Sequence, residues 1–265
     1  MLTPCLWFDT EALDAAKFYI DIFPDSKLGN ITRYLEPNPH VPGTQAWDVL
    51  TVEYTLMGIP FMGLNGGPYF KKDPSISFFV NIQDRSLVDT LWSKLLDDGV
   101  ALMPLAAYDW SEYYGWIQDK YGVSWQLYYR AEDTVWQTIS PLLAFTKENV
   151  WKAEEAIAFY TSIFPNSSTQ GLARYMEGEE GGIPWQVKHG QFRLHDTVMM
   201  AMDASGPHDF TFSCGISFLI PCRDQEEIDF YYDRLSAVPE AEQCGWLSGN
   251  YGVSLPLITM NLEKM

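Results

Sequence analysis

The chain has 265 residues, of which 47% are hydrophobic and 15% aromatic, enough apolar material for one large or two ordinary folded domains. Its 35 acidic and 17 basic side chains give a formal net charge of -18, which repels nucleic-acid phosphates and anionic membrane surfaces and argues against both as partners. No apolar run approaches the roughly 20 residues of a membrane helix. The first residues, MLTPCLWFDT, lack the basic region and apolar core of a signal peptide, so we expect a cytoplasmic protein. The four cysteines show no CxxC spacing, which predicts free thiols.

The first half of the chain predicts two strand-and-helix modules. LWF begins an extended stretch, and the apolar spacing over residues 12–23 predicts a helix that is capped by Asp9 or Thr10 and ends at Pro24. Three strands are predicted next, in NITRYLE, AWDVLTVEYTLMG and IPFMGLN. The same order then returns, with a strand in SISFFVNI, a helix over 85–96, and strands near ALMPL, YYGWIQD and VSWQLYY. Each module is therefore βαβββ.

The second half repeats phrases of the first. FYIDIFPDS at 18–26 returns as FYTSIFPNS at 159–167, an offset of 141, and GVS at 122 returns at 252, an offset of 130. ISFFV likewise returns as ISFLI. The chain is thus a tandem duplication whose second copy is about ten residues shorter, the loss lying in a loop or edge strand.

The second copy follows the same plan. Strands are predicted in ISPLLAF, ARYME, WQVKHGQFRL, TVMMAMD, GISFLIP and GWLSGNYGVSLPLI, and helices over 152–164 and 225–235. We therefore predict an α+β protein of four βαβββ modules in two tandem domains, residues 1–130 and 138–265, with a polar linker at 131–137.

These phrases resemble a known family. LWFDT, KFYIDIFPDSKL, LNGGPYF, ISFFV and GWIQDKYGVSWQ together resemble the PhnB-like, or demethylubiquinone methyltransferase-like, branch of the glyoxalase/bleomycin-resistance superfamily. The resemblance implies the vicinal-oxygen-chelate fold, in which paired modules curl around a concave pocket and single-domain relatives dimerise to complete it. The duplication would supply both halves in one chain as an internal pseudo-dimer, so we expect a monomer or a weak homodimer.

The resemblance also implies where a metal would bind. Catalytic members of the superfamily hold a divalent metal with His, Glu or Gln at four strand positions. Carried over to this sequence, these positions fall at or near Thr3, Phe61, Ser75 and Gln126 in the first copy, and Ser140, Met199, Gly215 and Pro256 in the second. Hydroxyl, aromatic, thioether, glycine and proline groups cannot replace imidazole and carboxylate, so we expect no metal and no other cofactor.

The histidines offer one alternative. His189 and His195 are six residues apart in an alternating segment, which predicts one strand face. Two hydrogen-bonded or solvated histidines are the favoured interpretation, and a two-histidine metal site is the alternative. His40 and His208 adjoin prolines in predicted loops.

Other catalytic motifs give no positive signal. The glycine cluster GLNGGP is followed by proline and a loop, whereas a methyl-donor nucleotide usually needs a glycine-rich turn between a strand and a helix. Neither a G-x-S-x-G elbow nor a Walker motif occurs.

The resemblance places several side chains near the pocket: Trp7, Asn65, Trp116 and Gln126, with Tyr114 and Cys244 at matching positions of the two copies. Alternation along VSWQLYY puts Ser124, Gln126 and Tyr128 on one strand face. Each of these residues also has a structural interpretation. Gln126 could be a core amide with all its hydrogen bonds made, the two tryptophans could serve core packing alone, and Cys244 could be an unreactive thiol. The second copy has Leu255-Pro256 in place of the Trp-Gln pair, so the two pockets cannot be chemically equal.

We therefore predict a metal-free protein that binds a small aromatic or amphiphilic molecule. The first alternative is a metal-dependent lyase, isomerase or dioxygenase-like enzyme that uses His189, His195 and nearby carboxylates. The second is a structural or regulatory partner-binding module, which would have a closed pocket and an exposed apolar patch. The sequence does not identify the ligand.

Overall fold

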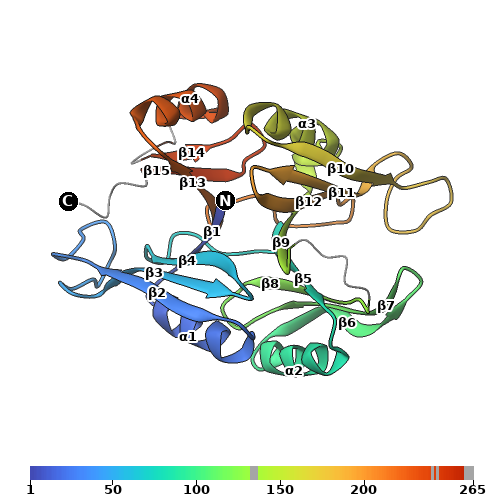
Figure 1. The fold of residues 1–265 in the computed structure, drawn as a ribbon, viewed down its shortest axis with the longest axis horizontal. Helices are drawn as coiled ribbons and strands as arrows, with labels where there is room; N and C mark the ends of the chain where they lie inside the picture. Colours follow the sequence, from blue (N-terminus) through green and yellow to red (C-terminus); the bar gives the residue numbers. More distant parts are fainter. Residues whose placement is uncertain (132–136, 240–241, 243–244, 260–265) are drawn as a thin grey trace. The chain divides into compact units, whose positions relative to one another are not determined.

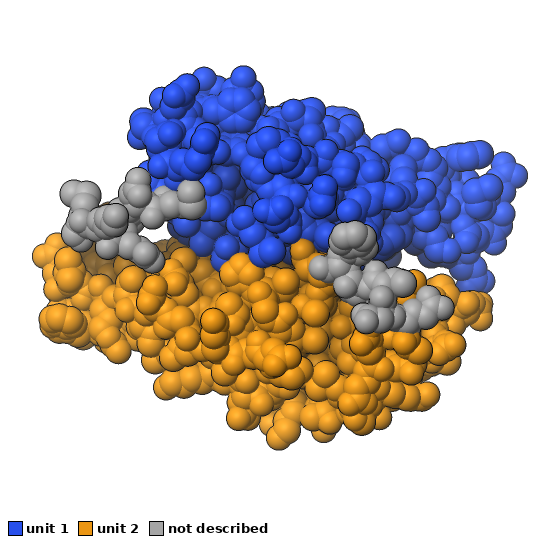
Figure 2. All heavy atoms as spheres, in the orientation of Figure 1, with its two compact units in different colours: residues 1–3, 141–265 blue, residues 4–140 orange. Residues whose placement is uncertain are grey.

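The computed structural model describes residues 1–131, 137–239, 242 and 245–259. The chain forms two compact units, shown in different colours in Figure 2: unit 1 consists of residues 1–3 and 141–265, and unit 2 of residues 4–140. Strands dominate both units and helices are few, which confirms the α+β class predicted from the sequence.

Unit 2 contains two modules of the predicted order. The first runs through β1 (Thr3–Phe8), α1 (Ala12–Ile22), β2 (Lys27–Arg33), β3 (Val49–Leu56) and β4 (Ile59–Asn65). The second runs through β5 (Ile76–Ile82), α2 (Arg85–Leu96), β6 (Val100–Tyr108), β7 (Ser111–Gln118) and β8 (Ser124–Tyr129). The strand orders are β2-β3-β4-β1 and β6-β7-β8-β5, with parallel β1–β4 and β5–β8 pairs. Helices α1 and α2 cover the same side of these strands (Figure 1).

Unit 1 repeats this plan. Its first module comprises β9 (Ile139–Phe145), the short 3-10 turn η1 (Lys147–Asn149), α3 (Ala153–Ile163), β10 (Ser168–Arg174), β11 (Val187–Leu194) and β12 (Thr197–Asp203). Its second comprises β13 (Ile216–Cys222), α4 (Gln225–Leu235), β14 (Trp246–Ser248) and β15 (Ser254–Thr259). Within the described ranges two strands follow α4, where three follow each of the other helices. The missing strand coincides with the shortening of the second copy.

The helix bounds agree closely with the sequence, but the predicted cap of the first helix was wrong. Glu11 precedes α1 and makes no capping bond with its side chain. The Ala12 N–H instead donates to Asn65 Oδ1 at 2.9 Å, because the end of β4 lies beside the start of the helix. In unit 1, the Ala153 N–H donates to Asp203 Oδ1 at 3.2 Å in the same way. Each of these helices is thus capped from the last strand of its own module.

The core of unit 2 is built around a buried carboxylate. Asp119 Oδ2 accepts hydrogen bonds from the Tyr19 hydroxyl at 2.7 Å and from Trp125 Nε1 at 2.8 Å. Its Oδ1 accepts from the backbone N–H groups of Tyr121 and Val123. Burial raises the pKa of Asp119, while these four donors oppose the shift. The carboxylate therefore ties the turn between β7 and β8 to helix α1.

The corresponding place in unit 1 is apolar and incompletely filled. A cavity of about 10 Å³ lies there, and the side chains that line it include Tyr160, Phe164, Met199, Phe218 and Leu255. Tyr160 is 3% exposed, and its hydroxyl has no hydrogen-bond partner among the described residues. This cavity is about the size of one water molecule.

Candidate functional site

One face of the β6-β7-β8-β5 strands collects polar and aromatic side chains. Trp125 on β8 packs against Tyr19 of α1, and Gly115 on β7 lies against Trp92 of α2, so these residues face the helices. Because side chains alternate along a strand, residues 114 and 126 face the opposite way. The strand register brings Phe79 beside Gln126, and places Gln126 opposite Trp116.

A directed hydrogen-bond chain crosses this face. The Tyr114 hydroxyl donates to Gln126 Oε1 at 2.8 Å, and Gln126 Nε2 donates to Ser77 Oγ at 2.8 Å. An amide oxygen can only accept and an amide nitrogen can only donate, so the chain runs in one direction. Burial raises the pKa of Tyr114, which keeps its hydroxyl protonated. The second N–H of Gln126 and the Ser77 hydroxyl proton have no acceptor in the described part of the chain.

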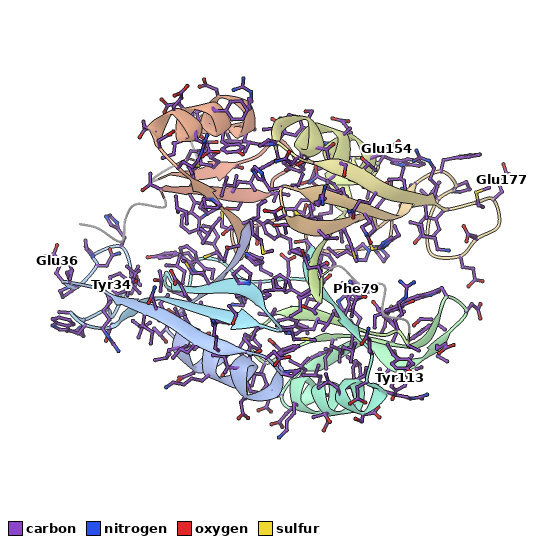
Figure 3. The ribbon with its side chains drawn as sticks, viewed as in Figure 1. Tyr34, Glu36, Phe79, Tyr113, Glu154 and Glu177 are labelled. Carbon is purple, nitrogen blue, oxygen red and sulfur yellow. The ribbon has the colours of Figure 1, made fainter. Side chains whose placement is uncertain are left out.

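Aromatic rings surround Tyr114. The ring of Trp110 lies 4.7 Å from the Tyr114 ring, edge on, and that of Tyr108 lies 5.9 Å away. Phe79, labelled in Figure 3, lies 5.2 Å from Tyr128 and 6.4 Å from Tyr114. Trp116 completes the group, donating its Nε1–H to Ser124 Oγ at 2.7 Å. Such a group offers flat surfaces for a planar molecule, with a fixed hydrogen-bonding chain beside them.

A hollow opens beside these rings. Its volume is about 430 Å³, within the range of pockets that hold small organic ligands. The side chains that characterise its lining are Tyr108, Asp109, Trp110, Glu112, Tyr128 and Arg130. It is open to solvent on one side and combines aromatic walls with charges of both signs.

The structure brings three of the predicted pocket residues together and uses two others elsewhere. Tyr114, Trp116 and Gln126 share the face just described. Trp7 donates its Nε1–H to the Gly67 carbonyl at 2.7 Å, and Asn65 caps α1. Both lie at the end of the β1–β4 pair and hold the fold together there. Cys244 lies outside the described residues.

The glycine cluster has a packing role. A Cβ atom on Gly66 would lie 2.1 Å from the indole of Trp7, so the backbone can approach this ring only without a side chain. Gly67 has φ +86° and accepts the indole N–H, as noted above. These glycines therefore enclose an aromatic ring; they do not form a phosphate-binding turn before a helix.

The carried-over metal positions do not fit a divalent ion. Phe61 packs within the aromatic core against Tyr54 and Phe78. Both polar ends of the Gln126 amide already bond Tyr114 and Ser77. In the residues that the structure describes, no three His, Cys, Asp or Glu side chains gather in a metal-binding arrangement.

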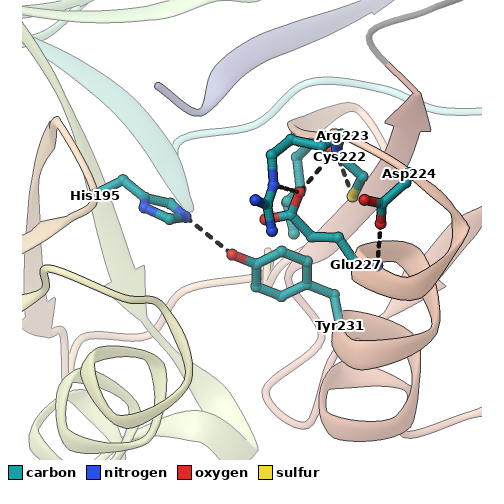
Figure 4. Close-up of polar contacts among 7 residues, drawn as sticks. His195, Cys222, Arg223, Asp224, Glu227 and Tyr231 are labelled. Atoms are coloured by element: carbon teal, nitrogen blue, oxygen red, sulfur yellow. Dashed lines mark hydrogen bonds and ion pairs between the residues drawn. The ribbon is translucent and has the colours of Figure 1, made fainter.

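The two histidines of the alternative metal site lie in different settings. Strand β11 ends at Leu194, so His195 lies in the following turn, where its Nε2 is 2.9 Å from the Tyr231 hydroxyl of α4 (Figure 4). His189 lies within β11. Burial lowers the pKa of both imidazoles. Nearby, burial raises the pKa of Cys222 to about 11, as expected for an unreactive thiol.

The sequence pattern missed several side chains of this face. Ser77 and Phe79 lie on β5, and Tyr108 and Trp110 near the β6–β7 turn. The alternation in ISFFV could have placed Ser77 and Phe79 on one face. Their position beside Gln126 depends on the parallel register of β5 and β8, which the sequence does not display.

Comparisons with known proteins give the following matches. The sequence model of the 3-demethylubiquinone-9 3-methyltransferase family matches residues 1–128 and 137–258. A PhnB protein from Bacillus cereus is 36% identical over 48% of this chain and 98% of its own, with a TM-score of 0.44. Glyoxalase I from Zea mays is 14% identical over 98% of this chain and 92% of its own, with a TM-score of 0.60. No curated protein matches the chain. No helix in the described ranges has the length and hydropathy of a membrane span.

Proposed function

The chain belongs to the 3-demethylubiquinone-9 3-methyltransferase family and has the fold of the glyoxalase/bleomycin-resistance superfamily, and from this premise we propose that it binds a small aromatic molecule without a metal ion. The binding surface is the face of β5, β8, β7 and β6 in unit 2 that carries Tyr114 and Gln126. The observation that supports this most is the directed chain from Tyr114 through Gln126 to Ser77 beneath a group of rings.

The chemistry of this face favours a planar ligand with an oxygen substituent. Rings such as Trp110 and Tyr108 stack on a flat molecule and contribute most of the buried apolar area. Arg130, in the lining of the hollow, can donate to a ligand carbonyl or phenol oxygen, and the buried chain of Tyr114, Gln126 and Ser77 holds the strands behind the rings. The name of the family refers to a demethylated ubiquinone, a ring of this kind.

Methyl transfer is not part of the proposal. The glycines that might have formed a nucleotide-binding turn, Gly66 and Gly67, enclose the Trp7 indole instead. Binding of the ring is supported by the geometry of the face, whereas a site for a methyl donor has no comparable support.

The test is a titration of chelator-treated protein with a short-chain ubiquinone and with its quinol. We expect quenching of tryptophan fluorescence and a rise in Tm, both unchanged by added Zn²⁺, Ni²⁺ or Mn²⁺. Tyr114→Phe should weaken binding by roughly tenfold, because the Gln126 amide loses the donor that orients it. Tyr113→Phe is the matched control: Tyr113 is the preceding residue of the same strand, and its hydroxyl donates to Asp89 of α2 on the other side of the strands (Figure 3).

Three outcomes would contradict the proposal. Binding that requires a stoichiometric divalent metal would favour the enzyme alternative. Equal losses for Tyr114→Phe and Tyr113→Phe would place the ligand elsewhere. No response to quinone, quinol or the aromatic probe 1-anilinonaphthalene-8-sulfonate would favour a module that binds protein partners.

A further inference from the structure

A second set of side chains lies in unit 1, on strands β11 and β12. Asp203 of β12 bonds the start of α3, and Gly190 of β11 lies against Ile157 of α3, so these two positions face the helix. Side chains alternate along each strand, so His189 on β11 and Met202 on β12 face the other way. Strand β12 therefore has a second face that does not take part in packing α3.

The strand register brings a histidine and two methionines to this second face. Gln191 is paired with Met200 and Gly190 with Ala201, and His189 and Met202 are the next residues along the two strands. Directly opposed Cβ atoms are about 5 Å apart and diagonal neighbours about 7–8 Å. These separations are within reach of a thioether on a flexible three-carbon side chain and of an imidazole.

The imidazole of His189 is available as a ligand. Among the residues that the structure describes, it makes no hydrogen bond, ion pair or ring contact. His189 is partly buried on this face, and imidazole is among the commonest metal ligands in proteins. Met200 is 6% exposed, which keeps its thioether out of water.

The chemistry of these three groups selects one kind of ion. Thioether sulfur and neutral imidazole are soft or borderline ligands that suit Cu(I), whereas Mg²⁺ and Ca²⁺ prefer oxygen. The nearest carboxylate in β12, Asp203, is engaged on the helix side with the N–H groups of Ala153 and Val187. We propose that His189, Met200 and Met202 form a binding site for Cu(I).

The first test is an anaerobic competition for Cu(I) between the protein and the chelator bicinchoninate. The expected result is one Cu(I) held per chain. Met200→Leu and Met202→Leu should each weaken this binding by roughly tenfold or more, which corresponds to at least about 1.4 kcal/mol. Leucine conserves the volume of methionine, so these variants are expected to fold.

Two variants control for nonspecific effects. Met199→Leu changes the same residue type on the same strand but on the helix side, beside the cavity near Tyr160, and should leave Cu(I) binding unchanged. His195→Gln removes the histidine that bonds Tyr231 and should also leave Cu(I) binding unchanged. His189→Gln, checked for folding by circular dichroism, should lose binding as the methionine variants do.

A second measurement reads the ligands directly. X-ray absorption of the Cu(I) or Ag(I) complex should show one nitrogen and two sulfur neighbours. Wild-type protein that does not compete with the chelator, a Met199→Leu loss as large as that of Met200→Leu, or an absorption spectrum without sulfur neighbours would each overturn the proposal. Failure here leaves the quinone titration of unit 2 unaffected, because the two sites share no residue.

Discussion

Tyr19 of unit 2 and Tyr160 of unit 1 occupy the same position of the repeated helix, yet their hydroxyl groups have different surroundings. Tyr19 donates to Asp119 at 2.7 Å. The residue that matches Asp119 in unit 1 is Gly249, and within the described residues the buried Tyr160 hydroxyl has no partner. The turn itself is retained, since Asp119 and Gly249 each donate their N–H four residues ahead, to Val123 and Val253.

The same difference recurs on the opposite face of the strands. Ser77 accepts a hydrogen bond from Gln126, whereas its counterpart Ser217 is buried without a partner among the described residues, because Pro256 stands at the position of Gln126. A buried hydroxyl without a partner costs about 1–3 kcal/mol. The two copies therefore share a backbone and an apolar interior, but the polar partners on the proposed ligand face are present in unit 2 and absent at the matching described positions of unit 1.

Of the changes that test this comparison, removal of the Asp119 carboxylate should lower the free energy of unfolding most. Asp119→Ala leaves the Tyr19 hydroxyl, the Trp125 indole N–H and two backbone N–H groups buried without an acceptor. We expect a loss of about 3–5 kcal/mol in the free energy of unfolding, measured by urea denaturation. Gly249→Ala is the control in unit 1, where no such bonds exist to be lost. A loss below about 1 kcal/mol would mean that water replaces the carboxylate.

Removing one buried tyrosine hydroxyl from each unit should change the free energy of unfolding by a smaller amount, with a decrease in unit 2 and no change or an increase in unit 1. Tyr19→Phe deletes a donor to Asp119 and should cost about 1–2 kcal/mol. Tyr160→Phe deletes a hydroxyl without a partner and should leave stability unchanged or raise it by up to about 1 kcal/mol. Hydrogen exchange read by mass spectrometry assigns each change to its unit. Equal losses for both variants would show that Tyr160 also has a partner in solution, such as a buried water.

The smallest of these predicted changes in stability is a destabilisation of unit 1 at acid pH, caused by protonation of His189 and His195. Burial lowers the pKa of His189 and His195, so the folded state disfavours the protonated rings. Their contribution to stability is therefore present above the ordinary histidine value of about 6.5 and is lost as the pH falls below it. Thermal unfolding at descending pH should show a smaller decrease in Tm for a double His189→Gln, His195→Gln variant than for the wild type. An identical decrease would assign the acid response to carboxylates.

The sequence predicted the modules well because their signals are local. Proline after a helical phrase and alternating apolar residues in strands both act within a few residues, and two of the four helices begin and end where predicted, at 85–96 and 225–235. The cap of α1 was wrong because its acceptor, Asn65, is 53 residues from Ala12 and reaches it only through the fold.

The candidate site was predictable in part for the same reason. Tyr114, Trp116 and Gln126 lie on adjacent strands of one hairpin, where spacing and alternation place them together. Ser77 joins them across a parallel pair, and the sequence does not display which residues of β5 and β8 are neighbours. Asn65 illustrates the reverse: a polar residue at a strand end looks like a ligand contact until the helix that it caps is known.

The caps of α1 and α3 also set an order of events during synthesis. Asn65 and Asp203 are the last residues of their modules, so neither helix has its N-terminal donor satisfied until the ribosome has delivered the whole module. A nascent chain that ends before residue 65 would hold α1 as a short helix with a frayed start, too short to be stable alone. Each of these two modules should therefore become protected from proteolysis in one step, when its final strand emerges and pairs in parallel with its first.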